Sequence, residues 1–276
     1  MATITSADVA KLRRMTLAGM MDCKKALEEA DGNFDKAIEI IRKKGQAVAS
    51  KRADREATEG VVLAKVSADG KFGAITVLNS ESDFVAKNEG FIQFATKIID
   101  IAIAKKPSTL DELKALPMDG GKVGEKVVEY IGIIGEKLEL SFFEKIEAEH
   151  VQAYIHPGNK LATLTGFNKP GLDIQVYKDI AMQVAAMNPV AVDKADVPAS
   201  VIAQEIEIGK EQARRDGKPE EMLEKIAQGK LAKFYKESTL LNQEFIKDSK
   251  LTIAQYLKSV NKELTVTGFK RFNLNQ

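Results

Sequence analysis

Residues 61–79, VVLAKVSADGKFGAITVLN, alternate apolar with small or polar side chains on both sides of Asp69-Gly70. A period of two is typical of β-strands, and an Asp-Gly pair between two such runs is typical of a tight hairpin turn. Residues 91–102 then repeat apolar side chains at helical spacing, and Pro107 follows their end. The expected unit of this fold is therefore hairpin, loop, helix and proline.

The same order recurs later in the chain. Residues 149–168 alternate around Pro157-Gly158, and residues 173–187 have the pattern of a helix that stops before Pro189. The first copy is longer, and its additional residues fall around 80–90, between the second strand and the helix. An insertion on a rigid scaffold is a common place for function. The repeat predicts an internal duplication of α+β units.

A charged segment follows the second copy. Residues 198–233 hold two amphipathic stretches joined by DGKP at 216–219, which is the pattern of a projecting αα-hairpin. Its apolar positions are Val201, Ile202, Ile206 and Ile208 on the first stretch and Met222, Leu223, Ile226 and Leu231 on the second. Helices are also expected over 110–116, 121–134 and 251–260, and strands over 137–147 and 263–274.

The N-terminal part of the chain has the pattern of three short helices. Thr5 or Ser6 is a suitable cap for the first, Gly32 stops the second, and Asn33 caps a third that is expected to end at Gly45. A bundle of this size is marginal on its own. It is therefore expected to serve as an attachment module.

Residues 42–55, RKKGQAVASKRADR, supply six basic side chains against a single acid, Asp54. Few of these positions are apolar, so no core is expected here. Two interpretations stay open, a solvated linker helix and a phosphate-binding patch. The second would make the protein an RNA- or ribosome-associated binding module.

The composition excludes several classes of protein. The 276 residues hold 41 Lys and Arg against 40 Asp and Glu, a net charge of +1, which argues against a general polyanion binder. One cysteine and two histidines cannot form a disulfide framework or a Cys/His zinc site within a monomer. No segment has the roughly 18 uninterrupted apolar residues of a membrane span, and the N-terminus has no apolar signal-peptide core. A cytoplasmic protein is expected.

The sequence has no phosphate-binding loop, dinucleotide-binding glycine motif, nucleophile elbow or zinc-protease motif. Cys23 falls on a bundle helix, where a buried and inert thiol is expected. His150 and His156 flank one predicted strand and would share a face, but no pair of carboxylates accompanies them. An enzyme is therefore disfavoured, and one that uses these three residues is kept as an alternative.

Asp83 and Phe84 stand side by side in a polar stretch, LNSESDFVAKNEGF at 78–91. An aromatic side chain in such surroundings has little reason to be there unless it packs on something. One hypothesis is that Phe84 tucks under the following helix as a local staple. The other is an anchor for a partner, since burial of one Phe contributes about 1.5–3 kcal/mol and aromatic residues dominate binding hot spots.

Four stretches carry a resemblance to a known family. They read TLAGMMDCKKALEEADGNFDKAI at 16–38, EG at 59–60, NSESDFVAKNEGF at 79–91 and LLNQEFIKD at 240–248. Together they resemble bacterial elongation factor Ts, the family of guanine-nucleotide exchange factors of elongation factor Tu. The MMDCKKAL and DFVAKN blocks are the specific parts of this similarity, whereas the charged αα-hairpin is generic.

The resemblance implies an α+β fold of several parts, and the residue patterns indicate the same division. The expected parts are an N-terminal three-helix (UBA-like) bundle over 1–45, a basic helical linker over 46–59, a core subdomain with an antiparallel sheet over 60–136, a similar one over 137–190 and 234–276, and an inserted coiled-coil αα-hairpin over 191–233.

The resemblance also implies which residues bind the partner. Asp83 and Phe84, followed by Val85, match the family pair that intrudes between helices of the partner's GTPase domain beside its magnesium site. The other implied contacts are Arg13, Met20, Met21 and Lys24 on the bundle, Ile134 and Gly135 in the first core subdomain, and His156, Ile246 and Lys247 in the second. No catalytic residue, metal site or cofactor is expected, because GDP, GTP and Mg²⁺ are bound by elongation factor Tu.

Elongation factor Tu is thus the expected partner, with self-association through the coiled-coil hairpin as an additional option. Neither a membrane nor direct nucleic-acid binding is expected. Three residues depart from the family pattern, because Leu17 replaces a usual glycine, Ser82 a usual threonine and Glu244 a usual proline. Serine keeps the hydroxyl cap, whereas the other two leave the geometry of their loops open. Some members append a helical module after the last strand, and the resemblance implies that neither this module nor the partner contact that it makes is expected here.

Overall fold

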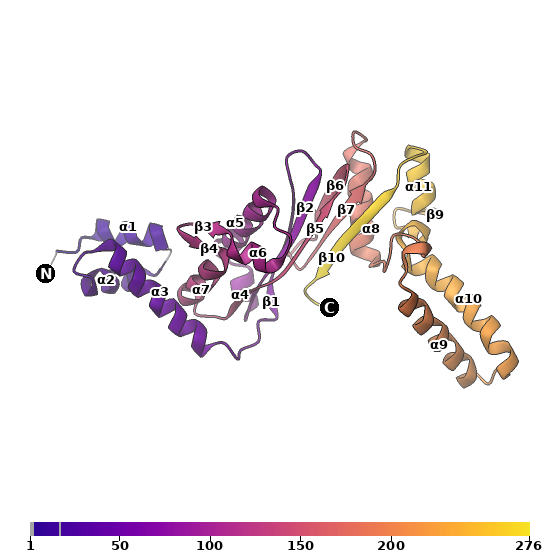
Figure 1. The fold of residues 1–276 in the computed structure, drawn as a ribbon, viewed down its shortest axis with the longest axis horizontal. Helices are drawn as coiled ribbons and strands as arrows, with labels where there is room; N and C mark the ends of the chain where they lie inside the picture. The colour runs from indigo at the N-terminus through magenta and orange to yellow at the C-terminus, as the bar shows by residue number, and fades with distance from the viewer. Residues whose placement is uncertain (1–2, 17) are drawn as a thin grey trace. The chain divides into compact units, whose positions relative to one another are not determined.

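A computed structural model describes residues 3–16 and 18–276, so the departure at Leu17 lies outside the described residues. Helices and antiparallel strand pairs are both present, which confirms the α+β class. Figure 1 shows the elements in chain order. The contacts divide the chain into two compact units: unit 1 comprises Met1–Leu63, Ile75–Glu144 and Asn273–Gln276, and unit 2 comprises Ala64–Ala74 and Lys145–Phe272.

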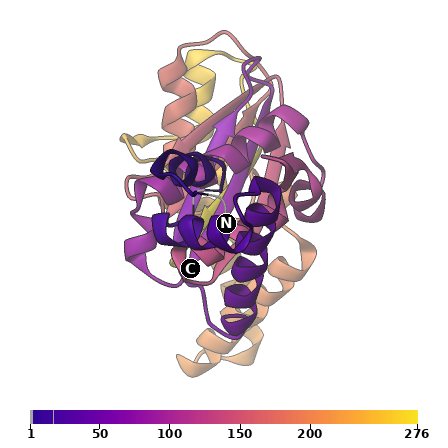
Figure 2. The same ribbon diagram turned by 90° about the vertical axis from the view of Figure 1, so that its left-hand side faces the viewer.

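The N-terminal bundle of unit 1 consists of α1 (Ser6–Thr16), α2 (Met20–Glu29) and α3 (Phe34–Lys51), the indigo helices that face the viewer in Figure 2. Asn33 caps α3, since its side chain accepts a hydrogen bond from the N–H of Lys36 at 3.0 Å. The three predicted helices are confirmed. Their apolar faces meet in a small core of Val9, Leu12, Ala18, Cys23, Ala26, Leu27, Ala30 and Ala37.

The predicted end of the third helix at Gly45 is wrong, because α3 continues to Lys51. Gly45 is buried where α3 crosses α7 (Val123–Ile134). A Cβ atom added to Gly132 of α7 would lie 2.4 Å from Cα of Gly45, and one added to Gly45 would lie 3.4 Å from Cα of Glu129. Gly45 therefore lies in the interior of α3, where the absence of a side chain permits a close crossing with α7.

The predicted elements that come after the bundle occur in the predicted order. Residues 52–58 are turns and extended chain, so only the first part of the expected helical linker is a helix. β1 (Glu59–Val66) and β2 (Phe72–Ser80) form the predicted hairpin, and β5 (Leu138–Glu147) joins β2 in a sheet of order β1-β2-β5. The other elements are α4 (Asp83–Ala86), α5 (Glu89–Lys105), α6 (Leu110–Ala115), β3 (Pro117–Met118) and β4 (Gly121–Lys122).

Unit 2 contains the second hairpin and its helix. β6 (His150–Ile155) and β7 (Leu161–Phe167) are antiparallel, and β10 (Val266–Asn273) completes a sheet of order β10-β7-β6. α8 (Ile174–Met187) supplies Tyr177, Ile180 and Val184 to the core, where they meet Phe167 and Leu257. The predicted second hairpin, the helix before Pro189 and the closing strand are confirmed.

The αα-hairpin is confirmed as well, and Figure 1 shows its helices α9 (Ala199–Arg215) and α10 (Glu220–Ser238) side by side. A small residue lies where the two helices meet, since a Cβ added to Gly209 would be 3.1 Å from Cα of Ala227. Ile208 and Met222, which the sequence places on the apolar faces, are instead 38% and 44% exposed. α10 also continues beyond the predicted limit at 233.

The remaining elements of unit 2 are short. They are the 3-10 turns η1 (Lys194–Asp196) and η2 (Leu240–Asn242), the antiparallel pair β8 (Glu244–Phe245) and β9 (Asp248–Thr252), and α11 (Ile253–Val260). No helix in the described part of the chain is long and apolar enough to cross a membrane. The domain limits expected from the sequence stay predictions.

Candidate partner-binding surface

Phe84 lies on α4, a single helical turn that follows β2. Ser82 caps this turn, since its Oγ accepts a hydrogen bond from the N–H of Val85 at 3.4 Å. The serine at this position thus keeps the capping role that a threonine would have. The side chain of Phe84 is 84% exposed, so the hypothesis of a local staple is wrong. Phe84 is an apolar side chain presented to solvent.

Asp83 precedes Phe84 and is half-buried, as is Val85. Nζ of Lys87 lies 2.6 Å from Oδ2 of Asp83, one turn further along the chain. The hydrogen bond to Asp83 and the charge of its carboxylate raise the pKa of Lys87. Phe84 therefore lies, along the chain, between the two residues of an ion pair, Asp83 and Lys87.

Loop L1, residues 80–87, is tied at its base to the chain that follows α7. Ser82 donates from its N–H to Oε2 of Glu136 at 2.9 Å and from its Oγ to Oε1 of Glu136 at 2.7 Å. In the opposite direction, Lys137 donates from its N–H to Oε1 of Glu81 at 2.5 Å. Nη1 of Arg52 lies 2.9 and 3.0 Å from the two carboxylate oxygens of Glu81. Charge-assisted hydrogen bonds thus hold both Glu81 and Ser82.

These donors favour the ionised form of Glu81. The N–H of Lys137 lowers the pKa of Glu81 most, burial opposes this shift, and Arg52 lowers the pKa further. Nζ of Lys137 also donates to the carbonyl oxygens of Ala53 and Arg55 at 2.9 and 2.8 Å. The chain after α3, loop L1 and the chain after α7 therefore form one connected network within unit 1.

Ile134 and Gly135 lie at the end of α7, directly before Glu136. Gly135 has a φ of 80°, and its N–H donates to the carbonyl oxygen of Ile131 at 2.8 Å. It thus ends α7 as a C-terminal cap in the left-handed backbone conformation. A Cβ added to Gly135 would meet no atom within 4 Å, so the backbone conformation is what requires glycine. Both residues adjoin, along the chain, the carboxylate that holds Ser82.

The bundle residues expected to bind the partner are exposed on α1 and α2. They are Arg13, Met20, Met21 and Lys24, and Met21 is 64% exposed. Nζ of Lys24 lies 3.8 Å from Oε1 of Glu28 on the same helix. Methionine side chains are flexible and polarisable, which suits an adaptable apolar contact. The surface combines two methionines with two basic side chains.

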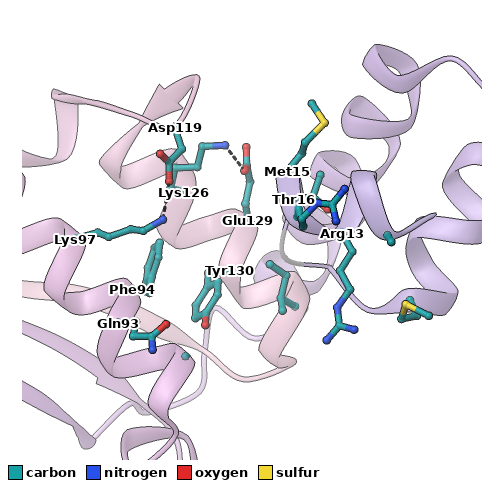
Figure 3. A pocket seen from close by; sticks show the side chains of 15 residues that line it. Arg13, Met15, Thr16, Gln93, Phe94, Lys97, Asp119, Lys126, Glu129 and Tyr130 are labelled. Atoms are coloured by element: carbon teal, nitrogen blue, oxygen red, sulfur yellow. Dashed lines mark hydrogen bonds and ion pairs between the residues drawn. The ribbon is translucent and has the colours of Figure 1, made fainter. Parts of the chain in front are cut away.

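Arg13 and Met20 also line a cavity of about 750 Å³, whose other walls come from α5 and α7 (Figure 3). Phe94 and Tyr130 stack in one wall with ring centroids 4.3 Å apart. Four charged lining residues form two ion pairs, Lys97 with Asp119 at 3.4 Å and Lys126 with Glu129 at 2.7 Å. Among residues 3–16 and 18–276, no group of three or more His, Cys, Asp or Glu could hold a metal ion.

The histidines and the cysteine have separate surroundings. His150 stacks on Tyr177 with ring centroids 3.8 Å apart, and burial lowers its pKa. His156 follows β6, is exposed, and its Nδ1 lies 2.9 Å from the hydroxyl of Tyr154. Cys23 is fully buried in the bundle core, and burial raises the pKa of its thiol. These contacts give no support to an enzyme that uses the three residues together.

Loop L2, residues 244–248, carries Ile246 and Lys247 between β8 and β9. Ile246 is 43% exposed, and its N–H donates to Oε1 of Gln183 at 2.9 Å. Nε2 of Gln183, a fully buried side chain of α8, donates to Oε1 of Gln243 at 3.2 Å and to the carbonyl oxygen of Glu244 at 3.1 Å. A neutral buried amide therefore supports the backbone of L2.

Lys247 is held against α8 by a buried carboxylate. Its Nζ lies 2.6 Å from Oδ1 of Asp179, to which Nε2 of Gln175 also donates at 2.6 Å. The hydroxyl of Tyr256 lies 3.4 Å from the other oxygen of Asp179. Burial and the nearby charge of Asp179 raise the pKa of Tyr256 to about 12. Glu244 begins β8.

The basic segment over 42–55 is largely paired with acidic side chains. Arg42 lies 2.7 Å from Glu129 and Lys43 lies 2.7 Å from Glu39. Lys44 pairs with Asp22, and Arg52 with Glu81. Each pair reduces the positive potential available to phosphates. This arrangement favours the linker interpretation over the phosphate-binding patch.

Comparison with known proteins shows a family match that includes the contact residues of both loops. A sequence model of the family described as Elongation factor TS matches residues 81–276. A relative from Porphyromonas gingivalis named Elongation factor Ts is 56% identical over 273 residues, which cover 99% of this chain and 98% of the relative. The chain belongs to the elongation factor Ts family. The resemblance found in the sequence is thereby confirmed.

Further elongation factor Ts relatives cover this chain to a similar extent. One from Flavobacterium psychrophilum is 52% identical over 272 residues, 98% of this chain and 98% of the relative. One from Parabacteroides distasonis is 42% identical over 328 residues, again 98% of each. The similarity to these elongation factor Ts proteins therefore includes the N-terminal bundle, which lies outside the region that the family model matches.

Four residues of this chain that support loops L1 and L2 were not predicted from the sequence: Glu81, Glu136, Asp179 and Gln183. The two glutamates have the pattern of ordinary surface charges. A signal did exist for the other two, because they alternate at helical spacing with Val176, Ile180 and Val184 on the buried side of α8. A polar residue on an apolar helix face requires a hydrogen-bond partner.

Proposed function

We propose that this protein promotes the release of GDP from elongation factor Tu and performs no covalent chemistry of its own. Family membership supports the choice of partner, since the relatives are named Elongation factor Ts. The observation that carries the proposal is Phe84, a large apolar side chain that is 84% exposed at the tip of a loop tied at its base. Such a side chain is suited to insertion into another protein.

Exchange follows from thermodynamic linkage. A protein that binds the nucleotide-free partner more tightly than the nucleotide-bound partner weakens nucleotide binding by the same factor. Phe84 inserts into an apolar slot of the GTPase domain and displaces a helix there. Asp83, together with Val85, helps to hold the partner's helix in its displaced position. The Mg²⁺ and phosphate sites of the partner are disturbed as a result.

The other implied contact residues supply binding free energy that offsets this strain. In unit 1 these are Met20, Met21, Arg13 and Lys24 on the bundle, with Ile134 and Gly135 at the end of α7. In unit 2 they are His156, Ile246 and Lys247. Burial of a Phe side chain contributes about 1.5–3 kcal/mol, which is enough to shift an exchange rate by an order of magnitude or more.

Stopped-flow release of a fluorescent GDP from elongation factor Tu, with and without this protein, tests the proposal. The wild-type protein is expected to accelerate release strongly. Phe84→Ala is expected to slow the stimulated release at least tenfold, about 1.4 kcal/mol, because the inserted ring is lost while the fold is unaffected.

Met222→Ala is the matched control, since Met222 is an exposed apolar side chain outside the proposed contacts. Its stimulated release should equal that of the wild type. Circular dichroism of both variants checks that the fold is retained. Unchanged stimulated release with Phe84→Ala would refute the insertion of Phe84.

A further inference from the structure

The conformation of α4 needs support from outside the helix. α4 comprises the four residues Asp83–Ala86, and a single helical turn is unstable alone because nucleation is costly. Ser82 provides the cap, but a cap is effective only if its own position is fixed. The orientation of Phe84 therefore depends on what holds Ser82.

Glu136 holds Ser82 by two hydrogen bonds to one carboxylate. The N–H of Ser82 donates to Oε2 and its hydroxyl to Oε1, so both the backbone and the side chain of the cap are fixed. The hydroxyl proton is directed to Glu136, which leaves Oγ as the acceptor for the N–H of Val85. Glu136 thus determines both the place and the hydrogen-bonding role of the cap.

Glu81 provides the reciprocal half of the same arrangement. Its carboxylate accepts the N–H of Lys137, the residue after Glu136, and is paired with Arg52. Two consecutive residues of L1 and two consecutive residues after α7 are therefore joined in both directions. Each carboxylate satisfies a backbone N–H of the other segment, so loosening one contact loosens the other.

We propose that Glu136, assisted by Glu81, is a positioning residue for nucleotide exchange that pre-orders Phe84 for insertion. This inference rests on the proposed function. A side chain that is already oriented loses less conformational freedom on insertion, so more of its burial free energy is available to displace the partner's helix. Glu136 acts through Phe84 and does not itself enter the partner.

The main test compares Glu136→Ala with Glu136→Gln in the stopped-flow assay over a range of exchange-factor concentrations. Glu136→Ala is expected to lower the maximal release rate about fivefold, while the half-saturating concentration changes by less than about twofold, because the other contact residues still bind. Glu136→Gln keeps an acceptor for the N–H of Ser82 and is expected to restore the maximal rate to within about twofold of wild type. Glu139→Ala, an exposed carboxylate on β5, is the matched control.

A double-mutant cycle separates positioning from a general structural effect. In the Phe84→Ala background, Glu136→Ala should cause no further loss, because the ring that it positions is absent. A second fivefold loss in that background would overturn the proposal. So would a fall in affinity with an unchanged maximal rate, or failure of Glu136→Gln to restore the rate.

Amide hydrogen exchange of the protein alone tests the contact without the partner. Glu136→Ala should accelerate exchange of the Ser82 and Val85 amides and leave the bundle amides unchanged. Unaltered exchange at Ser82 would overturn the inference even if GDP release is stimulated. Absence of stimulation by the wild-type protein would instead refute the proposed function, and with it the role of Glu136 in exchange.

Discussion

Loops L1 and L2 present candidate contact residues on supports of opposite chemistry. L1 rests on the carboxylates of Glu81 and Glu136, which are only partly buried and join segments more than 50 positions apart, since Ser82 and Glu136 are separated by 54. L2 rests on Gln183, a neutral amide that is fully buried. A partly exposed carboxylate can turn to water when its loop opens, whereas a buried amide cannot. Substitutions in the supports of L1 should therefore mainly slow the stimulated release of GDP. Substitutions in the supports of L2 should mainly lower the free energy of unfolding.

The largest expected effect is on stability, with Gln183→Ala. Removing this amide leaves the N–H of Ile246 and the acceptors at Gln243 and Glu244 without their partner and opens a cavity, a loss of about 3 kcal/mol in the free energy of unfolding. Urea denaturation followed by circular dichroism measures this loss. Glu136→Ala should cost only about 1 kcal/mol in the same assay, because water can replace the carboxylate.

Lys178→Ala is the control on the same helix, because Lys178 is exposed on α8. It should shift the free energy of unfolding by less than about 0.5 kcal/mol. Equal losses for Gln183→Ala and Glu136→Ala would remove the proposed difference between the two loops.

A second change tests whether L1 depends on the distant crossing of α3 and α7. Gly132→Ala would place its Cβ 2.4 Å from Cα of Gly45, and forced separation of the two helices should cost about 2 kcal/mol. Arg52, at the end of α3, would then be displaced from Glu81. Differential scanning calorimetry measures the stability, and the stopped-flow assay measures the accompanying loss of exchange.

Gly229→Ala is the matched control for this change, since a Cβ at Gly229 of α10 would meet no atom within 4 Å. Replacing an exposed helical glycine by alanine should stabilise the protein by about 0.5–1 kcal/mol. If Gly132→Ala is equally stabilising, the close crossing does not exist in solution.

The third expected effect concerns the tips of the two loops. Ile246→Ala should slow the stimulated release of GDP about threefold, or about 0.7 kcal/mol, against the tenfold loss expected for Phe84→Ala. Ile246 is already more than half buried within its own unit, so it has less apolar surface to offer a partner than Phe84. Stopped-flow measurements on both variants decide this ranking, and a reversed order would make L2 the principal contact.

The smallest expected effect is the titration of the Glu81 carboxyl in L1, which has no counterpart in the neutral amide that supports L2. The pKa of Glu81 lies below its ordinary value of 4.5, mainly through the N–H of Lys137. A lowered folded-state pKa means that its stabilising contribution is complete above about pH 4.5 and is lost as the pH falls through the folded-state pKa. The carboxyl carbon shift of Glu81 in NMR spectra should therefore titrate with a midpoint below 4.5.

Arg52→Met sharpens that measurement. It should raise the midpoint, since one cation is lost, yet leave it below 4.5, because the N–H of Lys137 is still donated. A wild-type midpoint at or above 4.5 would show that the contact with Lys137 is not formed.

Much of the fold could be predicted because its signals are local. Both hairpins, the cap at Asn33 and the helices before Pro107 and Pro189 follow from alternation, helical periodicity and turn residues within a few positions. The unusual Asp83-Phe84 pair was also visible in the sequence. Gly45 misled the prediction, because a glycine that ends a helix and a glycine that permits a helix crossing look the same without the second helix.

The residues of this chain are sufficient to indicate most of its helices and strands and its membership of the elongation factor Ts family. The tertiary structure was needed to establish that Phe84 is exposed, that Glu136 holds Ser82 and that Gln183 supports Ile246. Periodicity and capping depend on neighbours a few residues away, which the sequence contains directly. Exposure and hydrogen-bond partners depend on groups 54 to 63 positions distant, and only the folded chain brings those groups together.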